Sequence, residues 1–105
     1  MTYIVVAKSG RRLCVRRNLG NARRAASRAG GEVYTPEALR VKQARLTVAV
    51  AMEASRESTR LMSRPADGLA ARVELTAAMA RHSIDTARRM TAAMNYGTPN
   101  ARSLS

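Results

Sequence analysis

The sequence predicts a mostly helical α+β chain, in which a small N-terminal β-β-α-β unit precedes a long antiparallel helical hairpin. Three observations lead to this prediction. Short runs of β-forming residues alternate with turn signals up to residue 35, a strong helix start follows, and a single breaker interrupts the helical pattern from there to residue 96. Ala, the best helix former, also dominates the apolar residues.

The first half of the N-terminal unit is a predicted β-hairpin. Residues 3–7 are rich in β-formers, and residues 13–15 form a second short apolar run. Residues 8–11 between them include Gly10, which is free to take a positive φ angle in a tight turn. We therefore expect two antiparallel strands joined at this turn.

The second half of the unit is a predicted short helix followed by a strand. Asn18 or Asn21 can cap the helix, and Gly30 with Gly31 can stop it. Residues 32–34 are long enough for one more strand. The inward side of the helix is expected to carry four alanines, Ala22, Ala25, Ala26 and Ala29.

The hairpin is predicted to consist of helices at about residues 36–63 and 67–96. Thr35, Pro36 and Glu37 supply a cap residue, a proline at the first helical position and an acid near the positive helix end. The joint between the helices is short, which makes them antiparallel, and each arm is about 40 Å long at 1.5 Å per residue.

The chain is thus divided into a basic unit at residues 1–35, a hairpin at 36–96 and a coil tail at 97–105, where no periodicity is seen. A chain of 105 residues is expected to form one compact domain or one subunit of an assembly.

The first long helix carries two apolar stripes, almost opposite each other. One stripe comprises Leu39, Leu46, Val50, Ala54 and Leu61, and the other comprises Val41, Ala44, Val48, Ala51, Met52 and Met62. A helix that is apolar on two sides is usually packed on both. We expect one stripe to contact the second helix, and the other to contact the β unit or a neighbouring subunit. The candidate assembly interface is Val41, Val48, Met52 and Met62.

The second long helix shows one stripe, which we expect to be its single buried face. The stripe comprises Leu69, Val73, Ala80, Ile84, Ala87 and Met94. The charged residues Glu74, Arg81, Asp85, Arg88 and Arg89 lie on the far side.

Basic residues are concentrated at the N-terminal end. The chain has 17 Arg, 2 Lys and a formal net charge of +12, and eight basic residues precede its first acid, Glu32. A segment of one sign repels itself and needs counter-charge from a partner or from bulk ions. The guanidinium fork suits phosphate and carboxylate, although a solvated basic face and an Arg-rich genome are simpler interpretations. The candidate residues for binding nucleic acid or an acidic partner are Arg11, Arg12, Arg16, Arg17, Arg23, Arg24 and Arg28.

The kind of nucleic-acid contact is limited by what the sequence lacks. No aromatic residues interleave with the arginines, so a base-stacking platform is not expected. No helix-turn-helix, zinc-finger or ribbon-helix-helix pattern is evident. We expect contact with a DNA or RNA backbone without strong sequence preference.

Catalysis is not predicted. The only histidine, His82, has Asp85 one turn away, but no further ligand that would complete a metal site. Cys14 has no base nearby in sequence. Glu53 and Glu57 share a helix face but are flanked by arginines, which favours ion pairs. We expect no catalytic, metal or cofactor site and no small-molecule substrate.

The N-terminus does not resemble a signal peptide, and the longest mostly apolar stretch, residues 46–52, is too short to cross a bilayer. We expect no membrane partner and a location in a virion or the host cytoplasm.

Together these observations favour a non-enzymatic structural or assembly protein that packs through its hairpin with other protein subunits and presents its arginines to nucleic acid or an acidic protein surface. A small virion component of a bacteriophage fits the size and the Ala and Arg bias. Two alternatives stay open: a free, sequence-nonspecific nucleic-acid-binding accessory protein, and a small inhibitor of a host enzyme or defence complex.

Overall fold

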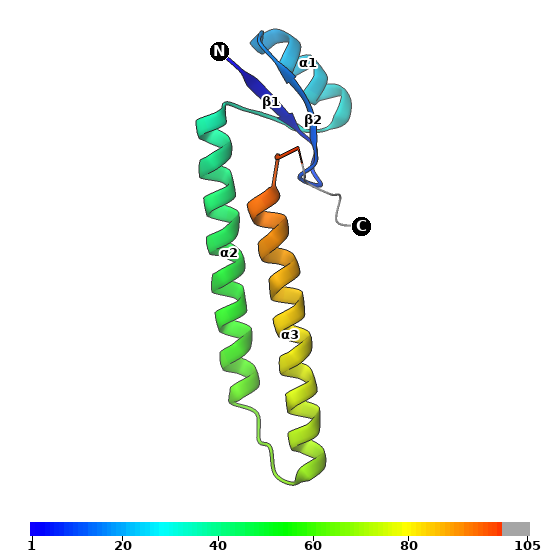
Figure 1. Cartoon of the computed structure of the whole chain (residues 1–105), viewed down its shortest axis with the longest axis vertical. Helices are drawn as coiled ribbons and strands as arrows, with labels where there is room; N and C mark the ends of the chain where they lie inside the picture. Colours follow the sequence, from blue (N-terminus) through cyan, green and yellow to red (C-terminus); the bar gives the residue numbers. More distant parts are fainter. Residues whose placement is uncertain (100–105) are drawn as a thin grey trace.

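The computed structural model describes residues 1–99 and confirms the mostly helical α+β class. The elements are β1 (Tyr3–Val6), β2 (Arg12–Arg16), α1 (Leu19–Ala29), β3 (Glu32–Tyr34), α2 (Pro36–Met62) and α3 (Leu69–Asn95). The sheet and α1 sit at one end of a hairpin made by α2 and α3 (Figure 1). Of the predicted tail, residues 97–99 form no helix or strand, and residues 100–105 lie outside the described residues.

The three strands form an antiparallel sheet in the order β2-β1-β3. In the middle strand, Ile4 is opposite Val15 and Tyr34, while Val5 is opposite Cys14 and Val33. Residues directly opposite each other point to the same side of a sheet, and neighbours along a strand point to opposite sides. The short central strand therefore supplies apolar side chains to two separate layers.

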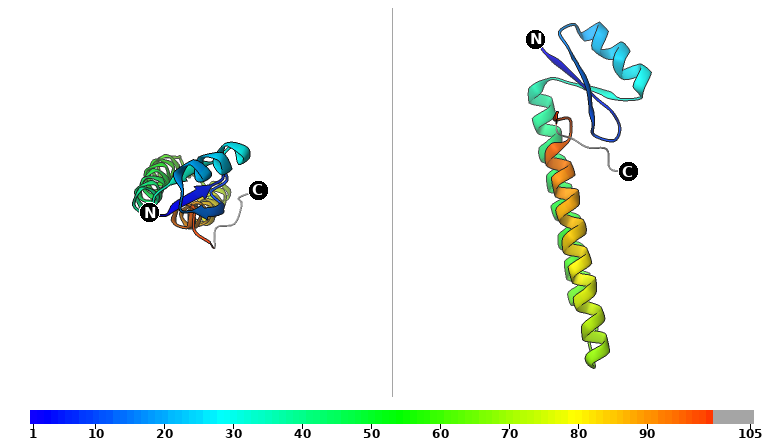
Figure 2. Two further views of the ribbon diagram at one scale, coloured as in Figure 1. Left: turned by 90° about the horizontal axis from the view of Figure 1, so that it is seen from above. Right: turned by 45° about the vertical axis from the view of Figure 1, so that its right-hand side comes forward.

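Each layer of the sheet has its own small core. On one side Val5 packs against Ala22 and Ala26 of α1. On the other side Ile4 and Val6 pack against Leu39 at the start of α2. The sheet is therefore held between α1 and the end of the hairpin, as the two further views show (Figure 2). Of the four alanines predicted to face inward, Ala22 and Ala26 are buried, Ala25 is half-buried, and Ala29 is exposed at the helix end.

Local signals place the helix ends close to their predicted positions. The Asn18 side chain accepts a hydrogen bond from the Asn21 backbone N–H at 3.2 Å, so Asn18 is the cap of α1. The Thr35 hydroxyl accepts one from the Ala38 N–H, also at 3.2 Å. Gly30 ends α1 in the left-handed conformation, with φ of 66°.

A short segment after α3 ties the hairpin to the sheet. The Gly97 N–H donates to the carbonyl of Gly10 at 2.7 Å, and Arg12 Nε donates to the carbonyl of Gly97 at 2.7 Å. The amide of Gln43 donates to the carbonyl of Tyr96 at 2.7 Å, which adds a link to α2. These bonds fix the end of α3 against both the β1–β2 turn and α2.

The hairpin makes the molecule long and thin. Its principal extents are 63 × 22 × 19 Å, and the radius of gyration is 18.6 Å, whereas a compact chain of this length has about 13 Å. The helices α2 and α3 run side by side along their whole length. Such a pair buries only one seam, and the buried residues of the two helices are Leu39, Leu61 and Ala93.

The predicted seam is correct for α2 and wrong for α3. In α2 the stripe that contains Leu39 and Leu61 faces α3. In α3 the predicted buried stripe is exposed, and Leu69 retains 80% of its accessible surface. The seam uses a second stripe of mostly smaller residues, Ala71, Leu75, Ala78, His82, Thr86 and Ala93. Small side chains let the helices approach closely, and the anchored Tyr96 fixes the rotation of α3 about its axis.

Candidate interaction surfaces

Apolar residues remain exposed along the outer side of α2. Val41, Val48, Met52 and Met62 are all at least half exposed, between 50% and 71%. The β unit covers none of them, so its predicted contact with this stripe, one of two alternatives, is wrong. The other alternative, a neighbouring subunit, stays a prediction.

The exposed stripes of α2 and α3 lie along the outer edges of the hairpin. At about 100° per residue, each exposed stripe lies roughly 150° round from the buried stripe of the same helix, so it points mostly away from the other helix. We call the two exposed stripes together the apolar face; it comprises Val41, Ala44, Val48, Ala51, Met52 and Met62 with Leu69, Val73, Ala80, Ile84, Ala87 and Met94.

One broad side of the hairpin is charged and is built from both helices. A cavity of about 650 Å³ on that side is lined from both helices. Arg89 of α3 pairs with Glu53 of α2 across the seam. The charged residues that line the cavity are Glu53, Glu57, Arg60, Arg64, Arg81, Asp85 and Arg89, with His82 beside them.

All eight large hydrophobic side chains that are exposed on the two helices belong to the apolar face. They are Val41, Val48, Met52, Met62, Leu69, Val73, Ile84 and Met94. Part of this face is a shallow groove of about 490 Å³ on α2 alone, lined by Val41, Ala44, Arg45, Val48, Ala49 and Met52. A monomeric protein rarely exposes such long apolar stripes.

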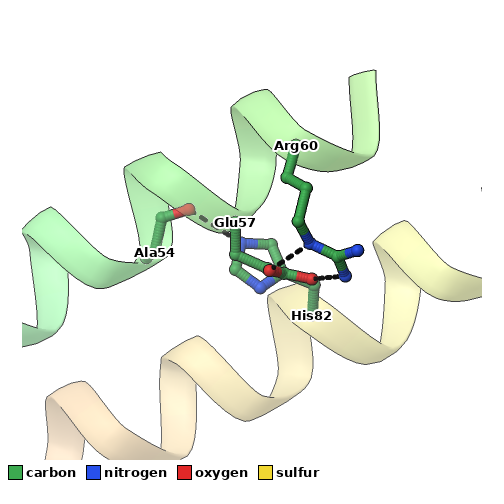
Figure 3. Close-up of polar contacts among 4 residues, drawn as sticks. All are labelled: Ala54, Glu57, Arg60 and His82. Atoms are coloured by element: carbon green, nitrogen blue, oxygen red, sulfur yellow. Dashed lines mark hydrogen bonds and ion pairs between the residues drawn. The ribbon is translucent and has the colours of Figure 1, made fainter. Parts of the chain in front are cut away.

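His82 contributes to the structure of the seam. Its Nε2 donates to the carbonyl oxygen of Ala54 at 3.1 Å, and a Glu57–Arg60 ion pair, whose charged atoms are 2.5 Å apart, lies beside the ring (Figure 3). Hydrogen bonds from Arg60 lower the pKa of the Glu57 carboxyl, and those from Arg89 lower the pKa of Glu53. These groups form a polar lattice between and along the helices.

The predicted arginine cluster is only partly brought together. Arg16, Arg24 and Arg28 surround a small pocket of about 190 Å³ on the outer surface of β2 and α1, with Asn21 and Ala25 between them. We call this surface the arginine pocket.

The other predicted arginines lie apart from this pocket. Arg12 is half-buried and bound to Gly97. Arg23 lies about 100° round α1 from Arg24, and Arg11 and Arg17 are exposed outside the pocket lining. None of the seven arginines forms an ion pair within residues 1–99.

A cleft between the sheet and the hairpin was not predicted from the sequence. It has a volume of about 660 Å³ and an apolar floor that includes Val6 and Val50. Both lysines of the chain, Lys8 and Lys42, line it. They are 34 positions apart on different elements, so no local pattern indicates that they meet.

Metal-ligating side chains do not form a cluster among residues 1–99. No three His, Cys, Asp or Glu side chains gather there as a metal site would require. Cys14 is half-buried in the sheet layer that packs on α1. Within the same residues, no helix is long and apolar enough to cross a membrane.

Comparison of the chain with protein-family models, with curated proteins and with solved structures gave no match. Function is therefore inferred from the geometry of the chain.

Proposed function

We propose that this chain is a non-enzymatic assembly protein, whose hairpin packs against another protein subunit through the apolar face and whose N-terminal end contacts a polyanion. The observation that carries the proposal is the row of large apolar side chains that stay exposed along each long helix, apart from the charged side that the two helices share. No element covers these side chains within residues 1–99.

The exposed surface supports association. The accessible surface of the chain is 7646 Å², whereas a compact protein of 11.4 kDa is expected to have about 5,800 Å². Covering apolar area stabilises a complex by about 25 cal/mol per Å² before the costs of association. A subunit packed on the apolar face would give the two thin helices the second layer that helical bundles normally have.

The polyanion contact is supported by the arginine pocket. Arg16, Arg24 and Arg28 present three guanidinium groups at one surface, and none has a carboxylate partner within residues 1–99. Guanidinium groups bind phosphate oxygens in bidentate fashion. Among polyanions we favour a nucleic-acid backbone. If the chain binds neither DNA nor RNA, the expected partner is an acidic protein surface.

Light scattering on purified variants tests the assembly function. Val48→Asp places a carboxylate at the centre of the apolar face and is expected to abolish association while helicity by circular dichroism is retained. The matched control, Arg60→Asp, makes a larger change of charge on the charged side of the same helix and is expected to leave association unchanged. If Val48→Asp alters neither association nor stability, the assembly proposal is wrong.

A second candidate function is favoured by the arginine pocket alone. A free nucleic-acid-binding accessory protein would use this pocket without any partner on the apolar face. It would remain a monomer and bind a random DNA duplex with an affinity that falls steeply as salt rises.

A further inference from the structure

The cleft between the sheet and the hairpin has the size and the lining of a small-molecule site. Its volume of about 660 Å³ lies within the range of about 300–1,000 Å³ that is typical of ligand pockets. Four segments build its walls: the β1–β2 turn, the connection from α1 to β3, and the helices α2 and α3. The groove of the apolar face, in contrast, is lined from a single helix.

The floor of the cleft is apolar along the seam of the hairpin. Leu46 and Val50 follow Lys42 at intervals of four residues on α2, so the three side chains line about 12 Å of one helix face at 1.5 Å per residue. Ala92 and Ala93 line the cleft from α3, and their small side chains leave room above the seam. The body of a matching ligand is therefore apolar and extended.

The sheet end of the cleft is positively charged. Lys42 Nζ lies 5.9 Å from the centroid of the Tyr96 ring, a cation–π contact that holds the ammonium group at the cleft. Lys8 lines the cleft from the β1–β2 turn, and its Cε lies 3.9 Å from where a Cβ atom of Gly30 would be. Neither lysine forms an ion pair within residues 1–99. Both ammonium groups can therefore bind an anionic group.

The charge balance of the cleft indicates how many negative charges the ligand carries. Arg89 also lines the cleft, but it is paired with Glu53. Glu32 is the acid in the lining, and it accepts a hydrogen bond from Tyr34. Because Glu32 offsets one of the two lysines, a single positive charge is left over. A monocarboxylate supplies one negative charge, whereas a phosphate monoester would bring about 1.5–2.

We propose that this cleft binds a small amphipathic monocarboxylate, with its carboxylate at Lys8 and Lys42 and its apolar body along Leu46 and Val50. Charge-assisted hydrogen bonds from the ammonium groups orient the ligand, and burial of its apolar body supplies affinity. The site is independent of the proposed assembly function, because no residue that lines it belongs to the apolar face or to the arginine pocket.

The two lysines give a direct readout of binding. After acylation with an amine-reactive reagent, each can be followed separately by mass spectrometry, because the chain has no other lysine. The probe is decanoate, used below the concentration at which it forms micelles, and the amino group of the N-terminus is the internal reference. At about ten times the dissociation constant, decanoate should slow the acylation of both lysines about tenfold, since only the unoccupied site reacts.

A neutral molecule of the same length is the comparison ligand. 1-Decanol lacks the carboxylate and is expected to protect the lysines far less than decanoate does. Equal protection by the two molecules, or no protection by decanoate, would overturn the proposal.

Two variants on α2 test where the carboxylate binds. Lys42→Gln is expected to raise the dissociation constant of decanoate, measured by titration calorimetry, about tenfold, because a hydrogen bond between charged groups is lost. The matched control is Arg45→Gln, which removes the same charge from the groove of the apolar face and should leave the dissociation constant unchanged. If Arg45→Gln weakens binding and Lys42→Gln does not, the anion lies in that groove and the proposal is wrong.

A third variant tests the apolar floor without changing any charge. Ala92→Leu places a larger side chain in the cleft and is expected to weaken decanoate binding at least as much as Lys42→Gln does, while helicity by circular dichroism stays that of wild type. Wild-type affinity for decanoate in this variant would contradict the proposed place of the apolar body.

Discussion

The rings of Tyr34 and Tyr96 meet edge to face where the sheet joins the hairpin. Their centroids are 6.0 Å apart, the planes cross at 85°, and the hydroxyl oxygens are 3.2 Å apart. The Tyr34 hydroxyl also donates to the carboxylate of Glu32. Burial, and then the bond to Glu32, raise the pKa of Tyr34, so its hydroxyl stays protonated. Two residues 62 positions apart thus hold the two parts of the molecule together.

Replacing Tyr96 is expected to loosen this junction. Tyr96→Ala removes the ring that packs on Tyr34 and should lower the free energy of unfolding by about 3 kcal/mol in a urea titration. Tyr34→Phe removes only a hydroxyl and should cost about 1 kcal/mol. If Tyr96→Ala and Tyr34→Phe lower the free energy of unfolding equally, the ring of Tyr96 contributes little to stability.

Gly97 is expected to resist substitution for a steric reason. It has φ of 71°, and a Cβ atom there would lie 2.6 Å from Leu39 Cδ1 and 3.0 Å from Val6 Cγ2. Gly97→Ala should therefore cost about 2–4 kcal/mol, from backbone strain and overpacking together. The matched control is Gly30→Ala, which has φ of 66° but no atom nearer than 3.9 Å, and should cost about 1 kcal/mol. Similar midpoints for the two variants in thermal unfolding would contradict this packing.

The ion pair between Glu53 and Arg89 predicts a pH dependence of hairpin stability. Hydrogen bonds from Arg89 hold the pKa of Glu53 below its ordinary 4.5. A carboxyl whose pKa is lowered by folding stabilises the fold fully above its unfolded pKa, and this contribution is lost as the pH falls through the folded value. Thermal unfolding of the wild-type chain should therefore shift to lower temperature below about pH 4.5.

Substitution of Glu53 gives the control for this pH effect. Glu53→Gln should unfold at a lower temperature than wild type at pH 7, and the difference should shrink as the pH falls toward 3. The effect should be modest, since exposed pairs stabilise proteins weakly. Glu57→Gln removes a pair within α2 alone and serves as the comparison. If the difference in unfolding temperature between wild type and Glu53→Gln stays the same from pH 7 to pH 3, the interhelical pair does not stabilise the hairpin.

Neutralising the arginine pocket is expected to weaken binding to any DNA sequence. Changing Arg16, Arg24 and Arg28 together to Gln should reduce the slope of log affinity against log salt by up to about 3, since each lost phosphate contact lowers it by about 0.9. The measurement is fluorescence anisotropy with a short random duplex at several salt concentrations. The control changes three arginines of the hairpin to Gln, namely Arg56, Arg81 and Arg88, and thus removes the same charge. If both triple variants lose DNA affinity to the same extent, the effect comes from net charge and not from the arginine pocket.

Much of the secondary structure was determined by short-range signals. Thr35 and Pro36 begin α2 as expected, because the cap bond and the fixed φ angle of proline act within one turn of helix. Gly30 ends α1 because a left-handed residue costs least at glycine. The inner stripe of α2 was also predicted correctly, since large residues at helical spacing identified it.

The packed side of α3 could not be predicted in this way. Both of its faces are apolar at helical spacing, and the larger residues, such as Leu69 and Ile84, lie on the side that does not pack. A second pattern, through Leu75, Ala78 and His82, was present in the sequence. Because its side chains are small, its apolar signal is weaker than that of the stripe with the larger residues. A closely packed seam nevertheless requires small side chains.

The sequence by itself located the helices and strands to within about two residues of their observed ends, because caps, turns and periodicity act over a few residues. Only the tertiary structure decided which face of α3 is buried, that Arg24 and Arg28 meet Arg16, and that Arg12 is bound to Gly97. These relationships join residues far apart in the chain. The hydrogen bonds of Tyr96 and Gly97 attach the end of α3 to α2 and to the β1–β2 turn.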